Sequence, residues 1–393
     1  MPTFYPPSLK DDLLSKMNND FVRWMPDRAG LGDAHVVPGT TIDPLLLSGL
    51  LLIIGYGLMV LYSAIEKDVV VLQAQTVRMG IAIIAMVVAA YISPRFYLRW
   101  APFIYIAGLV MCALVLVVGV TVKGATRRLE IPGITRFQPS ELMKLAVPLM
   151  VAAYLHDRPL PPNVRTLLVA LLITLVPAAL IVRQPDLGTS LLVAGAGLSV
   201  IVLAGLPWKL MMWSLVGVAA AAPGLWFLLE DYQRGQILTL FDPESDPLGA
   251  GWNTIQAKTA IGSGGVFGKG LHDGTQSQLN FLPESQTDFI IAVIGEELGL
   301  VGVLFLLALY LVVIARGLFM STQAASTFGR LVGGALTLTF FVYVFVNIAM
   351  VCGLLPVVGV PLPLVSYGGT SAITLLAGFG IVMSVHAHQT WRR

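Results

Sequence analysis

Asp288 is the residue whose type and setting most suggest catalysis. It lies near the end of the run 281–289 (FLPESQTDF), and an apolar segment follows directly. A carboxylate at this point can cap the next helix, or it can accept a proton as a general base. Spacing alone favours the capping role. A capping acid has a lowered pKa and is a weak base unless desolvation or neighbouring acids counter the effect.

Two further acids, Glu296 and Glu297, lie two turns deeper in the same segment. An acid at mid-bilayer costs roughly 2.5–3.5 kcal/mol, so such side chains are expected to face protein rather than lipid. We therefore expect this pair to face the protein and to hold helices together.

Glu141 and Lys144 are three residues apart in the run 136–144 (RFQPSELMK), where Pro and Ser mark a helix start. An acid followed by a base at this spacing can form an ion pair on one helix face. The pattern predicts the pair but leaves its role open, because a structural pair and a functional pair are equally compatible with it.

A second junction, 183–190 (RQPDLGTS), places Arg183 at the end of one predicted helix and Asp186 at the start of the next. Pro breaks the first helix and Asp186 can cap the second. Arg183 adds a cation to this end of the molecule, and Arg78 near the start of another apolar run is a further contributor unless it only snorkels to the interface. Arginines grouped in this way suit a phosphate-bearing ligand.

The longest segment without a spanning run is 230–287, and it contains the glycine-rich stretch 261–270 (IGSGGVFGKG). It is not a nucleotide-binding phosphate loop, because Ser263 stands where the first Gly belongs and Gly270 follows Lys269. We expect this loop to shape an outer cavity. The stretch 355–371, rich in Pro and Gly, suits a re-entrant segment buried in protein.

The composition places all of these residues in a membrane protein. Of 393 residues, 56% are hydrophobic and only 12% charged, and the mean hydropathy is +0.82. A soluble domain carries about a quarter charged residues. The net charge of +2 and the lack of a Lys/Arg run argue against a nucleic-acid partner.

The predicted fold class is an all-α polytopic membrane protein, because a crossing helix needs about 20 mostly apolar residues. About ten such runs occur. They lie near 44–64, 78–93, 101–122, 141–156, 166–183, 188–206, 209–229, 288–316, 329–352 and 371–388.

An even number of spans places both termini on one side, with 230–287 as a large extracytoplasmic loop between the seventh and eighth helices. We expect segment 1–41 and tail 390–393 in the cytoplasm and a transmembrane domain at 42–389. The positive-inside bias supports this, since most short loops on that side carry Arg or Lys. These are Arg95, Arg99, Arg158, Arg165, Lys209, Arg316 and Arg330.

The loop 123–140 is an exception, because it is outside by this count and yet strongly basic. Either the count is off by one, or the cations are kept for an anionic partner, which we favour because a shifted count would spoil the other loops. Its charges are Lys123, Arg127, Arg128, Glu130 and Arg136.

Together these motifs, in this order, resemble the SEDS family of polytopic peptidoglycan polymerases over about residues 43–388. The resemblance rests on the sequences QPSE (138–141), QPDLGTS (184–190), LPE (282–284), TDF (287–289), GEELG (295–299) and PLVSYGG (363–369). The stretches 274–279 (GTQSQL) and 356–362 (PVVGVPL) are similar to the elongation branch rather than the division branch.

The resemblance implies glycosyl transfer on lipid II, a lipid-linked disaccharide-peptide, at the outer face of the bacterial inner membrane. Asp288 matches the essential aspartate of the family and would be the general base, with undecaprenyl pyrophosphate as leaving group. Substrate-binding candidates are Arg78, Arg127, Glu141, Lys144, Arg183, Lys269 and Glu284. A divalent cation such as Mg or Mn could assist; no nucleotide or haem is expected.

Two positions depart from the family pattern. Gln286 stands where many members have His, so the proton environment near Asp288 is expected to differ from theirs. Arg128 stands where many have Trp, so the stacking role of that Trp does not carry over to this chain. Further implied partners are the nascent glycan strand, membrane lipids and a single-span class B penicillin-binding protein. A precursor flippase and a membrane scaffold are the alternatives; ionisable residues gathered at the outer face favour an enzyme.

Overall fold

The computed structural model describes residues 41–65, 68–122, 125–128, 138–227, 231–241, 250–278 and 284–388. The predicted 1–41 segment (up to residue 40), the 390–393 tail and much of the basic loop lie outside these ranges. The described chain is helical except for one two-stranded antiparallel hairpin. Its elements are α2 (Pro44–Ala64), α3 (Val69–Tyr91), α4 (Pro94–Val118), β1 (Val120–Val122), β2 (Ala125–Arg128), α5 (Pro139–His156), α6 (Val164–Val182), α7 (Leu187–Leu203), α8 (Trp208–Trp226), α9 (Asp231–Phe241), α10 (Ala250–Gly264), α11 (Thr275–Gln278), α12 (Ile290–Glu297), α13 (Gly299–Thr322), α14 (Thr327–Val351) and α15 (Thr370–Ala387).

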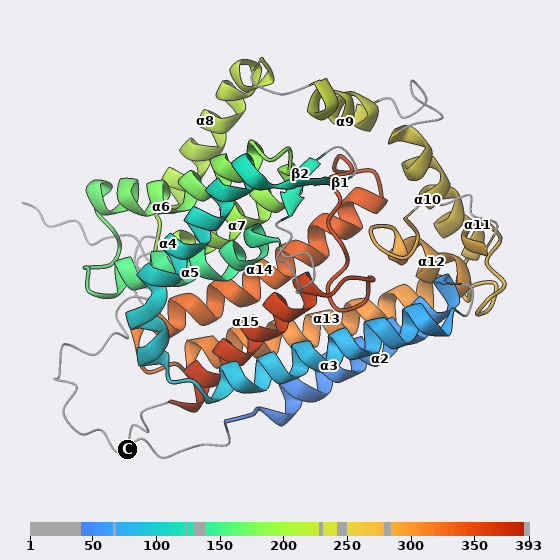
Figure 1. Cartoon of the computed structure of the whole chain (residues 1–393), viewed down its shortest axis with the longest axis horizontal. Helices are drawn as coiled ribbons and strands as arrows, with labels where there is room; N and C mark the ends of the chain where they lie inside the picture. Colours follow the sequence, from blue (N-terminus) through green and yellow to red (C-terminus); the bar gives the residue numbers. More distant parts are fainter. Residues whose placement is uncertain are drawn as a thin grey trace, which may run out of the picture.

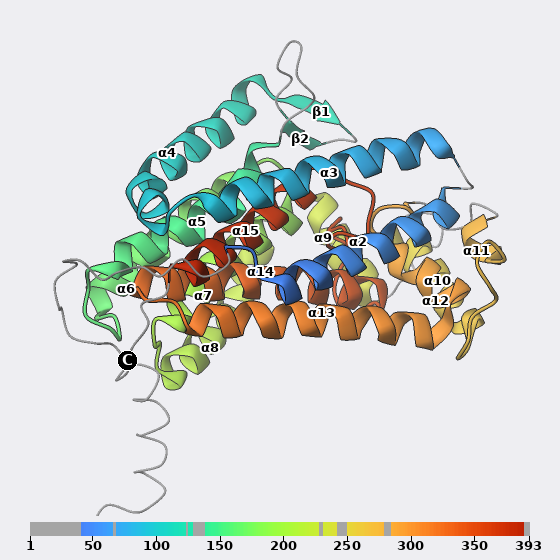
Figure 2. The same ribbon diagram turned by 90° about the horizontal axis from the view of Figure 1, so that it is seen from below.

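The long helices pack side by side around α14 and α15 (Figures 1 and 2). Within their most apolar 18-residue windows, 72% of α14 and 67% of α15 is buried, against 22% of α3. The outer helices therefore turn most of their apolar side chains away from the protein. Such a distribution is expected when lipid, which is as apolar as leucine, is the surrounding solvent.

Seven described helices are long and apolar enough to cross a membrane, and α7 is a shorter apolar helix. The chain is therefore polytopic. Every predicted run overlaps a helix, but the run at 288–316 is divided into α12 and α13. The division falls at Gly299, which has φ +66. Gly299 packs so closely against the loop 265–270 that a Cβ on it would lie 2.3 Å from Gly268 N.

The segment predicted as a loop between residues 230 and 287 contains the helices α9, α10 and α11, none of which qualifies as a span. Helix α10 packs against α12, and at Gly264 a Cβ would lie 1.9 Å from Gly295 O. The loop after α10 is hydrogen-bonded to the same region, with Lys269 N donating to Glu296 O (3.0 Å) and Leu300 N donating to Gly265 O (3.0 Å). These contacts fix α10 against the membrane helices.

The hairpin β1–β2 spans the start of the basic loop 123–140, with only β2 inside it, and departs from a purely helical fold. Val120, Thr121 and Val122 supply β-branched side chains, which favour strands over helices. Helix α4 therefore ends at Val118 instead of continuing to residue 122 as predicted.

Candidate functional site

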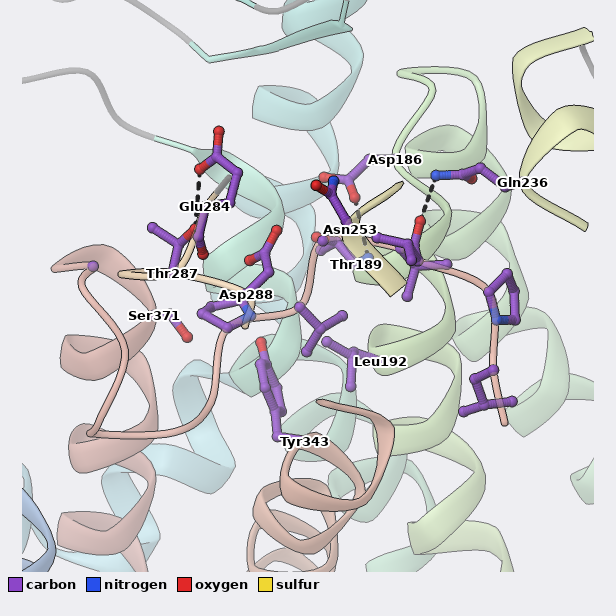
Figure 3. A pocket seen from close by; sticks show the side chains of 18 of the residues that line it. Asp186, Thr189, Leu192, Gln236, Asn253, Glu284, Thr287, Asp288, Tyr343 and Ser371 are labelled. Atoms are coloured by element: carbon purple, nitrogen blue, oxygen red, sulfur yellow. Dashed lines mark hydrogen bonds between the residues drawn. The ribbon is translucent and has the colours of Figure 1, made fainter. Parts of the chain in front are cut away.

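A cavity of about 650 Å³ opens between α5, α7, α9, α10, α14 and the loops that precede α12 and α15. Its wall is mixed in character, with polar and charged side chains beside a prolyl loop, and Figure 3 shows several of them directed into one shared space. The charged residues that the described part of the chain contributes to this wall are Glu141, Lys144, Asp186, Lys258, Glu284 and Asp288.

Asp288 lines this cavity and is not the cap of the helix that follows. Helix α12 has Phe289 as its N-cap, with no side-chain capping hydrogen bond. The capping role that spacing favoured is therefore wrong. The physical reason is that the chain turns into the helix one residue later than the acid, so the Asp288 side chain is directed into the cavity beside Glu284 and Thr287 (Figure 3).

The backbone around Asp288 is held at three consecutive carbonyl groups. Tyr367 N donates to Gln286 O (2.8 Å), Ser366 Oγ donates to Thr287 O, and Asn347 Nδ2 donates to Asp288 O (2.9 Å). We call these three donors, Asn347, Ser366 and Tyr367, the carbonyl cradle. Because a carbonyl on each residue is fixed, the Asp288 carboxylate is presented from a rigid segment.

The prolyl stretch predicted to be buried comes alongside Asp288. Asn347 also donates to Val360 O (2.7 Å), and Val360 and Leu362 are only 2% and 1% exposed. Gly359 has φ +67, and a Cβ there would lie 3.6 Å from Asp288 Oδ2. The positive φ favours glycine at this point, which allows the loop backbone to pass close to the carboxylate.

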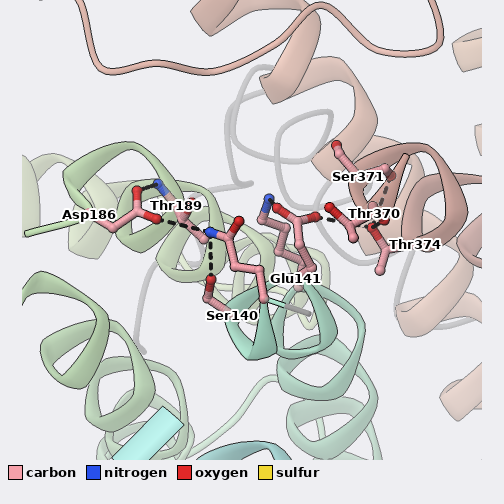
Figure 4. A network of polar contacts seen from close by, with 9 residues as sticks. Ser140, Glu141, Asp186, Thr189, Thr370, Ser371 and Thr374 are labelled. Atoms are coloured by element: carbon pink, nitrogen blue, oxygen red, sulfur yellow. Dashed lines mark hydrogen bonds and ion pairs between the residues drawn. The ribbon is translucent and has the colours of Figure 1, made fainter. Parts of the chain in front are cut away.

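Glu141 and Lys144 form the predicted ion pair, with Lys144 Nζ 2.6 Å from Glu141 Oε1. Both residues are buried, at 5% and 4% exposure. Lys144 Nζ also lies 4.7 Å from the centroid of the Tyr343 ring, and Thr374 Oγ1 donates to Glu141 Oε2 (3.3 Å). The pair is thus integrated into a polar network between α5 and α15 (Figure 4).

Asp186 caps α7 as predicted, accepting from Thr189 N (3.1 Å) through Oδ1. Its Oδ2 accepts from Gln138 Nε2 (3.1 Å), and Gln138 also donates to Ser140 Oγ (3.0 Å). These bonds join the start of α5 to the start of α7 (Figure 4). Asp186 lines the cavity as well, which a capping interpretation does not require.

Glu296 and Glu297 face the protein as expected, with exposures of 0% and 1%. Glu296 Oε1 accepts from Lys269 Nζ (2.8 Å) and from the backbone N of Thr275 (2.7 Å). Glu297 Oε1 accepts from Ser63 Oγ (2.8 Å). Lys269, a candidate for substrate binding, therefore holds its loop to Glu296 and does not line the cavity.

The described members of the predicted cation patch do not gather in the cavity wall. Arg183 is the exposed C-cap of α6 and is not part of the wall. Arg78 is not a wall residue either. Its guanidinium lies 4.7 Å from the ring centroid of Tyr367, and Tyr367 does line the cavity. Arg127 is on β2, and its side chain lies outside the part of the chain that the structure describes. Of the predicted cations, Lys144 alone is in the described wall.

Sequence reasoning missed Lys258 and Asn253 in α10 and Asn347 in α14. A lone polar residue in a helix gives no sign that the helix borders a cavity. The spacing of five between Asn253 and Lys258 gives no such sign either, because it places the two side chains about 140° apart around α10.

No group of three or more His, Cys, Asp or Glu side chains that could hold a metal ion occurs among the described residues. The cavity carboxylates come instead as separate side chains on different elements. A metal that depends mainly on protein ligands does not fit this arrangement, whereas one carried by substrate phosphate and a single carboxylate does.

Comparison with known proteins gives the family. The model of the FtsW/RodA/SpoVE cell cycle proteins matches residues 40–391. The chain belongs to this family. A peptidoglycan glycosyltransferase MrdB of Escherichia coli (strain K12) is 53% identical over 349 residues, covering 88% of this chain and 94% of that protein.

Solved structures of FtsW/RodA/SpoVE proteins have the same fold. A chain from a peptidoglycan synthase complex, studied for how polymerization and crosslinking are coordinated, is 34% identical with TM-score 0.77, covering 88% of this chain and 98% of that chain. The Thermus thermophilus rod shape determining protein RodA is 32% identical with TM-score 0.68, covering 89% and 98%.

Proposed function

We propose that this chain is a peptidoglycan glycosyltransferase that polymerises lipid II into glycan strands during cell elongation. The observation that carries the proposal is Asp288, which is held by the carbonyl cradle and directed into a cavity of about 650 Å³. The 53% identity to a named peptidoglycan glycosyltransferase supports the reaction class.

In this proposal Asp288 is the general base. The 4-hydroxyl oxygen of the acceptor sugar attacks C1 of the donor sugar while the Asp288 carboxylate takes the hydroxyl proton. A new C1–O bond forms, the bond from C1 to the phosphate oxygen breaks, and undecaprenyl pyrophosphate leaves with the bonding electrons. A single displacement of this kind inverts the configuration at C1.

The buried pair Glu141 and Lys144 would form one face of the substrate site. Lys144 is the predicted cation found in the described wall, and its ion pair with Glu141 leaves the pair with little net charge. Glu284 is exposed at the cavity and accepts from Thr287 Oγ1 (3.1 Å), next to Asp288. The Glu141–Lys144 pair and Glu284 would orient the sugars rather than exchange protons with them. Arg78, behind Tyr367, would hold that ring in place at the rim.

We propose that a divalent cation, Mg or Mn, enters with the substrate rather than occupying a preformed site. The separate carboxylates of the cavity support this, because Mg²⁺ often binds through one or two carboxylates and substrate phosphates. Glu284, the exposed carboxylate of the wall, is the residue best placed to contribute. When bound, the ion would neutralise charge on the diphosphate.

The proposed topology has ten spans, both termini in the cytoplasm and the cavity facing outward in the bacterial inner membrane. The ten predicted runs each overlap a helix, and the cytoplasmic assignment rests on the distribution of Arg and Lys in the short loops. Lipid II and the nascent strand would then meet in the outer leaflet, where an apolar tail can remain in the bilayer.

We also propose a single-span class B penicillin-binding protein as partner. The likeness to a chain from a complex that couples polymerization with crosslinking supports a transpeptidase partner. The partner would crosslink the strands that this chain produces.

The test of the function is reconstitution of the full chain with lipid II, alone and with its transpeptidase partner. We expect glycan polymers and release of undecaprenyl pyrophosphate. A flippase would instead move lipid II between the leaflets of sealed vesicles with no polymer and no released diphosphate. That outcome, in the presence of the partner, would contradict the proposal.

A further inference from the structure

Among the described residues of the cavity wall, negative groups outnumber positive ones, so an anionic substrate needs a positive group to meet it there. These residues supply four carboxylates, on Glu141, Asp186, Glu284 and Asp288, and two ammonium groups, on Lys144 and Lys258. A diphosphate brought into this space would be repelled by the net negative charge, because like charges interact strongly at a few ångströms where water is scarce.

The Lys144 ammonium already has partners within the protein. Its ammonium lies 2.6 Å from Glu141 Oε1 and faces the ring of Tyr343, and only 4% of the residue is exposed. A close ion pair has little net charge to offer a ligand. The other ammonium group among the described wall residues is that of Lys258.

Lys258 differs from Lys144 in both exposure and partners. It is exposed on α10, and in the part of the chain that the structure describes it forms no ion pair. Thr254, one turn before Lys258 on the same face of α10, and its neighbour Asn253 also line the cavity and offer hydrogen-bond donors. Figure 3 shows Asn253 and Asp288 among the side chains around the same cavity.

The position of Lys258 is set by Gly353, just beyond the end of α14. Gly353 has φ +71, and a Cβ there would lie 2.6 Å from Lys258 Nζ and 2.7 Å from Lys258 Cε. Any other residue would therefore displace the lysine. The next residue along the chain, Leu354, is an apolar side chain that is 72% exposed.

We propose that Lys258 binds the diphosphate of the polyprenyl-linked donor and stabilises it as it leaves. This inference rests on the proposed function and names the cation at the same site. Lys258 would meet the phosphate oxygens while Asp288, on another wall, takes the acceptor proton. The simpler alternative is that Lys258 only offsets the partial negative charge at the C-terminal end of α14.

Direct binding separates these two roles. Inorganic pyrophosphate, titrated into the full chain without acceptor or metal, should bind about tenfold more weakly to Lys258→Met than to wild type, because a charge-assisted contact is lost. Lys258→Arg should retain most of the affinity. Lys209→Met, which removes an exposed lysine outside the cavity, should bind as wild type does.

A thermal unfolding measurement on the same variants completes the test. Unchanged pyrophosphate affinity in Lys258→Met, with a lowered unfolding temperature, would assign the lysine to helix capping and overturn the inference. Equal weakening for a disaccharide-peptide without a diphosphate would also overturn it, since the contact would then be to peptide carboxylates.

Turnover of lipid II gives an independent readout. In Lys258→Met we expect both a higher KM and a lower kcat, because the contact persists as the leaving group departs; an unchanged kcat/KM would contradict the role. Failure of wild type to polymerise lipid II would refute the proposed function but leave the pyrophosphate titration readable.

Discussion

At the scale of single residues, the acids of this chain have separate roles because their surroundings differ. Asp288 is directed into the cavity, Asp186 accepts from Thr189 and Gln138, and Glu296 is fully buried with Lys269 and a backbone amide as donors. Of these three acids, only Asp288 faces the cavity without also capping a helix. This difference of setting is the basis for placing proton transfer at Asp288.

The pair Glu141 and Lys144 allows a residue-scale prediction. Lys144→Met would leave Glu141 buried without its cation, and breaking a buried ion pair costs about 3–5 kcal/mol. We expect a clear drop in unfolding temperature in detergent. The double variant Glu141→Gln with Lys144→Met should recover most of that stability, because no unpaired charge is left. Equal destabilisation in the single and double variants would contradict the pairing argument.

Sequence reasoning found this pair because an i, i+3 spacing of opposite charges is a local property. It also identified Asp288, although as a cap by spacing and as a base by family resemblance. Lys258 was beyond reach, since its importance depends on Gly353, almost a hundred residues later, and on the cavity between them. Arg183 is the exposed C-cap of α6 and is not in the described cavity wall, and the cations of the basic loop predicted to join it lie outside the described side chains.

At the scale of elements, helix α14 links the membrane core to the reactive segment. Asn347 is fully buried in this helix and donates to both Asp288 O and Val360 O. Through these two bonds one side chain fixes the distance between the segment before α12 and the prolyl loop. Asn347 is thus a positioning residue that acts through Asp288.

Asn347→Ala should therefore reduce kcat much more than it changes KM for lipid II. A displacement of about 1 Å in a catalytic group can cost about 100-fold in rate. Thr339→Val is the matched control, since Thr339 is buried in the same helix and donates only to Ala335 O within it. A loss of kcat of the same size in both variants would show that general weakening of α14, not positioning of Asp288, is responsible.

The element boundaries were predictable to the extent that apolar length decides them. Each apolar run became a helix, but the break between α12 and α13 was not foreseen. It depends on the loop 265–270 packing against Gly299, a contact between segments that no local pattern records. The hairpin was hidden for a related reason, because its short β-branched run continues the apolar character of α4.

At the scale of the whole molecule, helices far apart in sequence are joined by an ion pair at one end of the bundle. There Arg316 of α13 donates to Asp43, the N-cap of α2, with Arg316 Nη2 2.5 Å from Asp43 Oδ2. Burial alone would raise the pKa of the Asp43 carboxyl. The hydrogen bonds from Arg316 and from Leu46 N outweigh burial and lower that pKa below its usual value.

A carboxyl with a lowered pKa stabilises the fold above its unfolded-state pKa of about 3.9, and that contribution is lost as the pH falls through the folded-state value. We expect Asp43→Asn, which keeps a good cap, to unfold at a lower temperature at pH 7 and to approach wild type as the pH falls below about 4. Asp68→Asn, a cap on α3 without such an arginine, should show little difference. A gap that is independent of pH would contradict the assignment to the ion pair.

The orientation in the membrane is also testable on the whole molecule. In a background with both native cysteines replaced, Asp273→Cys should react with a membrane-impermeant maleimide in intact cells with a permeabilised outer membrane. Arg95→Cys should react only after the inner membrane is opened. Both positions are exposed, so access to the reagent and not burial decides the result. The reverse pattern would place the cavity in the cytoplasm and exclude the proposed outer-leaflet reaction.

The central claim is that Asp288 removes the acceptor proton during glycan polymerisation, and the rate of lipid II polymerisation by Asp288→Asn tests it most directly. Asn keeps the shape of the side chain and cannot take the proton, so we expect lipid II binding to persist while polymerisation falls by about 10²–10⁴-fold. Asp273→Asn, an exposed acid outside the cavity, should polymerise at the wild-type rate. Polymerisation by Asp288→Asn at the wild-type rate would contradict the account.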